Sequence, residues 1–294
     1  MKAKLAERKS FDAFRFTICT LLWGLQPSPL VAAVGNRLIS TMKNKNYLLP
    51  FLLFFTIAAS AQMSSPENLV YKKDIIKINV LALPLKNISV QYERILSRKI
   101  SAALGIRSMP QTSLPFKNIL INEVGNNDPD TKDVINNSRI SNLAITPELR
   151  FYLGKGYGRG FYIAPYYRYV RFSTNSITIN YSEPNGPKQS LSLSGDMSAN
   201  TGGVMFGAQW LLGKHVTLDW WILGAQYGTG TGNFNGLSSK SFTPGEQADI
   251  KQTLDDVDIP LVTKTVSVSA NNVHVNVGGP FGGLRSGLLI GIRF

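Results

Sequence analysis

Cysteine, histidine, charged residues and long apolar runs are all scarce in this chain. The single cysteine, Cys19, lies near the N-terminus, so neither an internal disulfide nor a cysteine metal site can form. Charged residues make up 17% of the sequence and hydrophobic residues 44%, which is too apolar for a disordered chain. No apolar run reaches the ~20 residues of a comfortable membrane-spanning helix. Together with 26 glycines, this composition favours an all-β chain.

The N-terminal region carries a secretion signal that starts late. A short basic stretch at 42–47 precedes an apolar run at 48–57, and small residues follow up to Ala61. This is the pattern of a signal peptide cleaved after Ala61, which directs the chain out of the cytoplasm. We expect Met42 to be the true first residue, although a longer or tandem leader would give the same pattern.

The expected organisation has four parts, and it argues against a nucleic-acid partner. Secretion removes the chain from nucleic acid, and no basic recognition helix or binding motif is present. The parts are a mis-assigned N-terminal extension at 1–41, a signal peptide at 42–61, a short periplasmic segment at 62–74 and a β-barrel at 75–294.

The mature region alternates apolar and polar residues between turn-forming residues, and it shows no sustained helical period. This pattern predicts eight strands, at 75–83, 88–96, 98–107, 142–153, 160–173, 199–212, 215–227 and 284–294.

The connections between these strands alternate in length. Tight turns are expected near Ser97, at 154–159 and at 213–214, whereas the intervening connections 108–141, 174–198 and 228–283 are long. The connection at 84–87 is short and breaks the rule. Short turns at one end and long loops at the other are typical of outer-membrane barrels. We therefore predict an eight-stranded antiparallel up-and-down transmembrane β-barrel, OmpA/OmpX-like, with long extracellular loops.

One face of each expected strand is apolar and the other carries the charge. In 142–153, for example, Leu149 and Phe151 alternate with Glu148 and Arg150. A membrane barrel turns its apolar face to lipid, so the charged face lines the lumen. Because buried charges must be paired, we predict a structural network in the lumen. Its members are Glu93, Lys99, Glu148, Arg150, Arg168, Asp219 and Arg293, with Lys77, Arg107 and Arg285 on the same inward face.

Aromatic residues recur on the apolar phase, near the short-turn end of six strands. Such residues gather at the membrane interface, so we expect outer-membrane lipid as a partner. The final strand also ends on an aromatic residue, which resembles the signal read by the outer-membrane assembly machinery. The six interface aromatics are Tyr92, Phe151, Phe161, Trp210, Trp220 and Phe294.

Some residues and loop segments depart from the regular strand pattern. Pro147 and Pro165 fall inside strands and predict bulges. Trp221 and Leu223 fall on the lumen phase, so either the interior is mixed or the strand shifts register near Trp220. In the loops, 174–198 predicts a strand extension, 244–254 a short helix, and the segment around 271–272 a second extension.

The sequence leaves the specific role open. Eight strands enclose a space that side chains largely fill, which argues against an open pore. We expect a non-enzymatic structural or surface-interaction role, carried by the long loops. A deacylase or esterase is one alternative, because His274 lies near Ser267, Ser269 and several aspartates. A narrow channel and a soluble periplasmic lipid-binding barrel are the others. No cofactor or metal motif is recognised.

Four segments of the chain are similar to a known family. They are 78–94, 145–152, 160–165 and 218–224, which read INVLALPLKNISVQYER, ITPELRFY, GFYIAP and LDWWILG. They resemble a secreted Bacteroidota DUF3575-like family of uncharacterised small outer-membrane β-barrel proteins, and the resemblance extends over 70–294. It implies an outer-membrane barrel and brings no assigned activity or catalytic residue.

Overall fold

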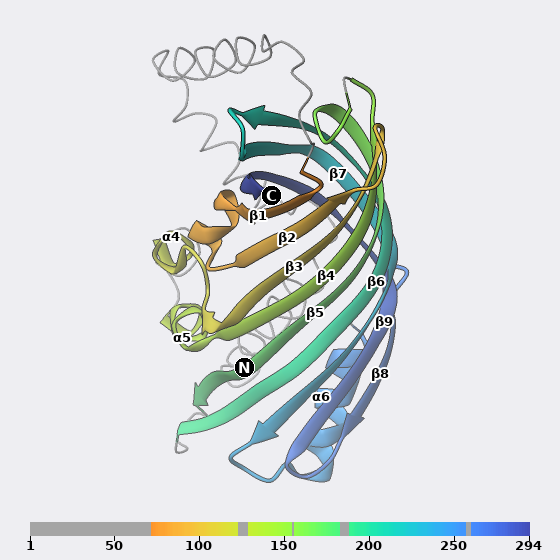
Figure 1. The fold of residues 1–294 in the computed structure, drawn as a ribbon. Helices are drawn as coiled ribbons and strands as arrows, with labels where there is room; N and C mark the ends of the chain where they lie inside the picture. The colour runs from red at the N-terminus through yellow and green to blue at the C-terminus, as the bar shows by residue number, and fades with distance from the viewer. Residues whose placement is uncertain (1–71, 123–128, 155, 183–187, 257–259) are drawn as a thin grey trace, which may run out of the picture.

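The computed structural model describes residues 72–122, 129–154, 156–182, 188–256 and 260–294. Within these ranges one antiparallel sheet curls into a barrel (Figure 1). The expected extension at 1–41, the signal peptide at 42–61 and nearly all of the segment 62–74 lie outside the described residues.

The described residues contain nine strands, and consecutive strands pair antiparallel from the first to the seventh. Their bounds are β1 (Asp74–Asn79), β2 (Ile88–Ile95), β3 (Ile100–Ser113), β4 (Arg139–Tyr152), β5 (Gly160–Ser182), β6 (Lys188–Leu212), β7 (Val216–Ser238), β8 (Thr263–Val268) and β9 (Asn272–Arg293).

The strand β9 closes the ring. One edge of β9 pairs with β7, and the other pairs with β1 from Leu289 to Arg293. The predicted eight-stranded up-and-down barrel is thus confirmed, with β1 to β7 and β9 as its wall. We call the end with the short turns the near end, and the opposite end the far end.

The second edge of β9 is not paired along its whole length. Beyond the contact with β1, the strand β8 takes up this edge between Val273 and Gly278. From 279 to 288, this edge pairs with no strand in the described part of the chain. We call this interruption of the strand pairing the wall gap.

Side chains alternate between lumen and exterior, and their polarity is the reverse of that in a soluble barrel. On β4, Leu149 and Phe151 are 38% and 39% exposed, whereas Glu148 and Arg150 are 5% and 0% exposed. The same inversion holds on β2 and β7, where Glu93 and Asp219 are fully buried. The predicted assignment of faces is therefore confirmed.

The first strand is shorter than the sequence predicts. Residues Val80–Leu85 form a 3-10 helix, η2, where the pattern predicts a strand to residue 83. The side chain of Asn79 accepts a hydrogen bond from the N–H of Leu81 at 3.1 Å, and Lys86 ends the helix in a left-handed conformation. Because this local bond competes with strand pairing, the prediction for 80–83 is wrong.

The two prolines inside strands do not produce bulges. Pro147 lies opposite Leu104, and Pro165 lies opposite Val204, in ladders whose register continues past them. The ladder between β4 and β5 also keeps one register along its length. Each proline removes one donor without adding a residue, so the predicted bulges are wrong.

A register shift does occur in β7. In its pairing with β9 the shift falls between Trp221 and Gly224. As a result Leu223 is 49% exposed on the outer face, while Trp221 is buried. The register shift near Trp220 is therefore confirmed, and the interior is also mixed, because Trp221 and Leu289 are buried in it.

The strands β5, β6, β7 and β9 extend well beyond β1 and β2 at the far end (Figure 1). The extensions predicted at 174–198 and around 271–272 are confirmed. Their described inner side chains pack with α6 (Pro244–Asp255), the predicted short helix, into one apolar cluster. Its members include Leu193, Met197, Phe234, Leu254, Val266, Val275 and Phe281.

Two further short helices, α4 (Lys117–Leu120) and α5 (Pro129–Asn137), lie in the connection between β3 and β4. None of the helices in the described ranges is both long and apolar enough to pass through a membrane.

Candidate functional site

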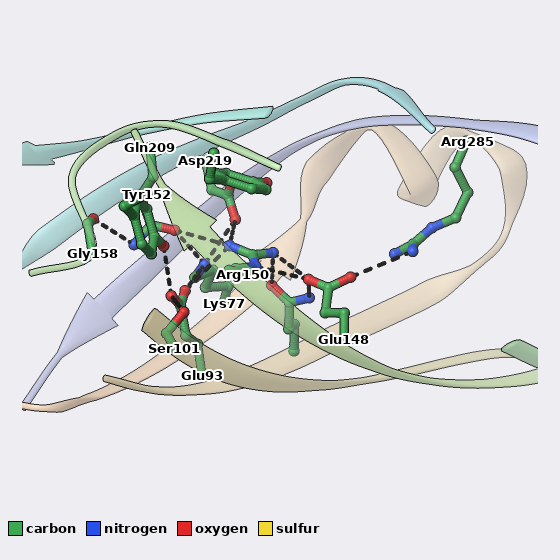
Figure 2. Close-up of polar contacts among 12 residues, drawn as sticks. Lys77, Glu93, Ser101, Glu148, Arg150, Tyr152, Gly158, Gln209, Asp219 and Arg285 are labelled. Carbon is green, nitrogen blue, oxygen red and sulfur yellow. Dashed lines mark hydrogen bonds and ion pairs between the residues drawn. The ribbon is translucent and has the colours of Figure 1, made fainter. Parts of the chain in front are cut away.

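The lumen holds a cluster of buried ion pairs that begins at Lys77 on β1. Its ammonium group donates to the carboxylate of Glu93 on β2, to Asp219 Oδ2 on β7 at 2.7 Å and to Gln209 Oε1 on β6 at 2.5 Å. Lys77 is only 1% exposed. One ammonium group thus ties together strands from opposite parts of the sequence (Figure 2).

Arg150 on β4 is the second cation of this cluster. Its Nη1 lies 2.7 Å from Asp219 Oδ2 and 3.2 Å from Glu93 Oε2. Its Nε and Nη2 donate to Glu148 Oε1 at 2.8 and 2.5 Å. The guanidinium also stacks over the Tyr162 ring at 4.5 Å. Arg150 is therefore held by acids from β2, β4 and β7 at once.

Neutral groups add further hydrogen bonds to these carboxylates. Glu93 Oε1 accepts from Ser101 at 2.5 Å and from Tyr152 at 2.6 Å. Tyr162 donates to Asp219 Oδ1 at 2.8 Å, and Gln91 donates to Glu148 Oε1 at 2.6 Å. Buried ion pairs are stable only when the other lone pairs are also satisfied, and here they are.

We call this cluster the lumen network. Charges of opposite sign nearly balance in it, and its groups fill the cross-section of the barrel at the level of Arg150. Such an arrangement can lock the strands in register and obstruct the lumen. It consists of Lys77, Gln91, Glu93, Ser101, Glu148, Arg150, Tyr152, Tyr162, Gln209 and Asp219.

The near end of the barrel is closed by the turn between β4 and β5. Gln209 Nε2 donates to the carbonyl oxygen of Gly158 at 2.9 Å, and the N–H of Tyr157 donates to the Arg98 carbonyl oxygen at 2.6 Å. Gly158 has a φ of 74°, which suits glycine. The turn therefore folds inward over the lumen network.

The sequence-predicted charged residues do not all enter the network. Glu93, Glu148, Arg150 and Asp219 are brought together, but Lys99 is exposed at the near end. Its ammonium group donates to the Gly154 carbonyl oxygen at 2.6 Å. Lys99 follows the short turn directly, so its long side chain reaches the rim, and its assignment to the network is wrong.

Arg293 and Arg168 lie on either side of the network. Arg293 is at the near end, where it donates to the carbonyl oxygens of Lys72 and Tyr157 at 2.6 and 3.0 Å. Arg168 lies toward the far end, where its Nη1 donates to Thr146 Oγ1 at 3.1 Å. Arg285 comes from the same side, and its Nη1 is 3.4 Å from Glu148 Oε2 (Figure 2).

Sequence reasoning missed the neutral members of the network. Gln91, Gln209, Ser101, Tyr152 and Tyr162 share the inward phase with the charged residues. Their position on the inward phase was the signal in the sequence that could have identified them. Their partners could not be known, because they depend on which strands meet across the lumen.

The six aromatic residues expected at a membrane interface all lie on the outer face. Tyr92, Phe151, Phe161 and Phe294 are exposed, and Trp210 and Trp220 are half-buried. The backbone of Phe294 pairs with Asp74, since its N–H donates to the Asp74 carbonyl oxygen at 2.8 Å. Phe294 thus takes part in closing the ring.

The residues considered for a hydrolase do not assemble a recognisable triad. Ser267 lies opposite His274 in the β8–β9 ladder, but the His274 Nδ1 contacts the amide oxygen of Asn235 at 2.6 Å. Asp255 instead binds Lys251 on the surface of α6, and Asp258 lies outside the described residues. Among the residues that the structure describes, no group of His, Cys, Asp and Glu could hold a metal ion.

Three solved structures show a distant likeness to this one. A major outer membrane protein from Thermus thermophilus has a TM-score of 0.33 and 15% identity, covering 75% of this chain and 99% of that one. The outer membrane protease OmpT from Escherichia coli has a TM-score of 0.34 and 8% identity, covering 75% and 92%. The translocator domain of the autotransporter NalP from Neisseria meningitidis has a TM-score of 0.25 and 7% identity, covering 84% and 95%. Likeness at these TM-scores supports no inference about function.

No curated protein sequence matches this chain. A family model does match it, over residues 51–253, and its description is "Protein of unknown function (DUF3575)". The match spans more than half of the chain and includes all four segments that carried the resemblance in the sequence. The chain therefore belongs to the DUF3575 family.

Proposed function

We propose that this protein is an integral outer-membrane β-barrel with a structural or surface-interaction role. The observation that carries the proposal is a band of exposed apolar side chains around the barrel, which we call the apolar belt. Water would penalise such a surface, whereas lipid would not. Its members include Ile78, Val90, Ile106, Ile145, Leu149, Phe151, Phe161, Val204, Phe206, Leu223, Leu284 and Ile290.

The height of the apolar belt suits a bilayer. Outward residues stay apolar from Leu143 to Phe151 on β4 and from Val204 to Leu212 on β6. A strand needs ~9–11 residues to cross a bilayer when it is tilted by about 45°. The belt on these strands has that length.

The belt ends sharply on β7. Its outward residues are apolar up to Tyr227, and beyond it they are Thr229, Thr231 and Asn233. Tyr167 on β5 and Tyr227 on β7 both lie opposite Gly202 on β6. Two tyrosines at one level, with polar residues beyond them, support a second membrane boundary there.

The lumen network supports a role other than that of an open pore. Lys77, Gln91, Glu93, Arg150 and Gln209 are all under 2% exposed, so the cross-section at their level is filled. The far-end extensions are held by their own apolar cluster, which suits a rigid projection. We propose that this projection acts by non-catalytic contact with a surface partner.

Two partners follow from this placement. Membrane lipid surrounds the apolar belt. The outer-membrane assembly machinery is the second, and it would engage β9 together with Phe294, the strand that closes the ring.

Fractionation combined with gel mobility tests the membrane placement. The protein expressed from its full sequence should be found in the outer-membrane fraction. It should also migrate faster in unheated than in heated detergent samples, because the closed barrel resists unfolding. Recovery in the soluble fraction with a single mobility would refute the proposal and favour a soluble lipid-binding barrel.

A further inference from the structure

A cavity lies next to the lumen network on its far-end side, and arginines dominate it. Its volume is about 90 Å³, whereas one water needs only ~10–15 Å³. It therefore has room for several waters or one small oxyanion. Arg107 from β3, Arg168 from β5 and Arg285 from β9 line it, and none of its described lining residues is acidic. We call it the arginine cavity.

The protein balances these three charges only in part. Arg168 is repelled by both Arg107 and Arg285, and it is attracted by Glu148. The nearest paired acid is Glu148, whose Oε2 lies 3.4 Å from Arg285 Nη1 and whose Oε1 is already held by Arg150. Arg168 and Arg285 are only 5% and 8% exposed. Buried cations need counter-charges, and Glu148 alone faces three arginines, so the cavity carries an excess of positive charge.

The donors around the cavity include one that has no acceptor. Each guanidinium carries five N–H donors. Arg107 uses one toward Asn142 Oδ1 at 3.1 Å, and Arg168 uses one toward Thr146 Oγ1. The indole N–H of Trp221, a buried residue that lines the cavity, has no hydrogen-bond partner. An unsatisfied buried donor beside three arginines that face a single acid independently indicates an acceptor-rich ligand.

The cavity reaches the outer surface of the barrel beside η2. Besides the inward arginines, its lining includes Leu81, Ile106 and Ser286, which are exposed on the outside. Ser286 belongs to the segment of β9 that faces the wall gap. An anion could therefore enter from the side of the barrel as well as along the lumen.

We propose that the arginine cavity binds a phosphate-type oxyanion, with Arg107, Arg168 and Arg285 as charge partners and Trp221 as a neutral donor. Guanidinium groups match the geometry of phosphate oxygens. The phosphate is either free or carried by a lipid whose headgroup enters through the wall gap. Only the lipid source rests on the proposed membrane placement.

Calorimetric titration of the purified barrel in neutral detergent tests the proposal. The probes are inorganic phosphate, a short-chain phosphatidate and a short-chain diacylglycerol that lacks phosphate. At least one of the two phosphate probes should bind with one site per barrel, and the diacylglycerol should not compete. Binding of neither phosphate probe would overturn the proposal.

Matched variants identify the site. Arg168→Gln should weaken binding at least about tenfold, since it removes a buried charge partner. Arg171→Gln should leave binding unchanged, because Arg171 is on the same strand but outside, paired with Asp196 at the surface. Trp221→Phe keeps the ring that stacks on Arg285 and should weaken binding less. Equal affinity of Arg168→Gln and the unmodified protein would refute the assignment.

The two phosphate probes distinguish a free phosphate from a lipid headgroup as the ligand. Binding of inorganic phosphate with no gain from acyl chains would assign a free oxyanion. Tighter binding of the phosphatidate would assign a lipid at the wall gap. Heat-modifiable mobility of each variant shows that the barrel is intact, so a loss of binding is not a loss of fold. If Arg168→Gln does not fold, the phosphate affinities of Arg285→Gln and Trp221→Phe are compared with that of Arg171→Gln. If all three variants bind phosphate as tightly as the unmodified protein, the proposal is overturned.

Discussion

At the scale of single residues, the guanidinium of Arg150 has the largest number of charged neighbours in the lumen network. It contacts Glu93, Glu148 and Asp219, and its side chain is fully buried. Removing a buried cation leaves its acids without a counter-charge, and this costs more than the pair itself contributed. The stability of the barrel should therefore depend strongly on this position.

Arg150→Met tests this dependence. We expect the free energy of unfolding to fall by about 3–5 kcal/mol, as for other broken buried pairs. Urea unfolding in detergent micelles, followed by the loss of the fast-migrating form, measures it. Arg94→Gln is the control, because the Arg94–Asp74 pair lies at the surface and should matter little. Similar midpoints for both variants would show that the lumen network does not stabilise the fold.

The charged members of the lumen network could be predicted from the sequence. The errors in that prediction have a physical cause. Alternation places Glu93, Arg150 and Asp219 inside, because each falls on the polar phase of its strand. Alternation cannot give the position of a side chain along the barrel axis, so Lys99 was assigned to the network although it reaches the rim. The arginine cavity was missed for a related reason: only the folded barrel shows which arginines lack an acid.

At the scale of elements, β6 and β7 are held close by glycines that leave no room for a side chain. A Cβ on Gly228 would lie 2.0 Å from the Asn200 carbonyl oxygen and 2.7 Å from the Thr201 Cα. These are backbone atoms of the neighbouring strand, which cannot rotate away. At Gly202, on β6, a Cβ would meet no atom within 4 Å.

Gly228→Ala and Gly202→Ala therefore form a matched pair. Gly228→Ala should lower the free energy of unfolding by at least about 1–3 kcal/mol through overpacking, and Gly202→Ala should leave it nearly unchanged. The temperature at which the fast-migrating form disappears reports both. Equal tolerance of alanine at the two positions would mean that the two strands are not packed as described.

The helix α6 depends on a local cap at its first turn. Thr243 Oγ1 accepts from the N–H of Glu246, and the Glu246 carboxylate accepts from the N–H of Thr243 at 2.7 Å. The Thr243 N–H and the Lys240 ammonium hold the pKa of Glu246 below its usual range. A lowered pKa in the folded state stabilises the helix above the usual pKa of Glu, and this contribution is lost as the pH falls through the folded value.

Amide exchange of α6 should show this dependence. Opening of the helix, corrected for the intrinsic exchange rate, should increase as Glu246 is protonated. Thr243→Ala should lower the free energy of opening of α6 by about 1 kcal/mol already at neutral pH. Glu246→Gln should abolish most of the pH dependence. If opening of α6 is equally pH-dependent in Glu246→Gln, another group controls the helix.

Prediction of elements succeeded where periodicity decides and failed where a single local bond decides. The eight wall strands follow from alternation, and α6 follows from the proline at its start and the residues that end it. The end of β1 was misplaced, since Asn79 forms its own turn with Leu81. The prolines were over-interpreted, because a ladder tolerates a missing donor without a change of register.

At the scale of the whole molecule, the filled lumen determines what can pass. The lumen network occupies the middle of the barrel, and the turn containing Gly158 closes its near end. Purified protein in planar bilayers should therefore show conductance at background level. Regular ohmic steps from the unmodified protein would contradict the described packing and favour a channel.

In the proposed membrane placement, the unequal strand lengths make the two sides of the barrel different within the membrane plane. The strands β5 to β7 and β9 rise far above β1 and β2, so the projecting part is a one-sided screen rather than a symmetrical collar. On β7 the outward residues of this screen are polar from Thr229 to Asn233. On the side of β1 and β2, an approaching molecule can reach η2 at the proposed membrane level. Two neighbouring copies would therefore make different contacts, depending on which side each one turns to the other.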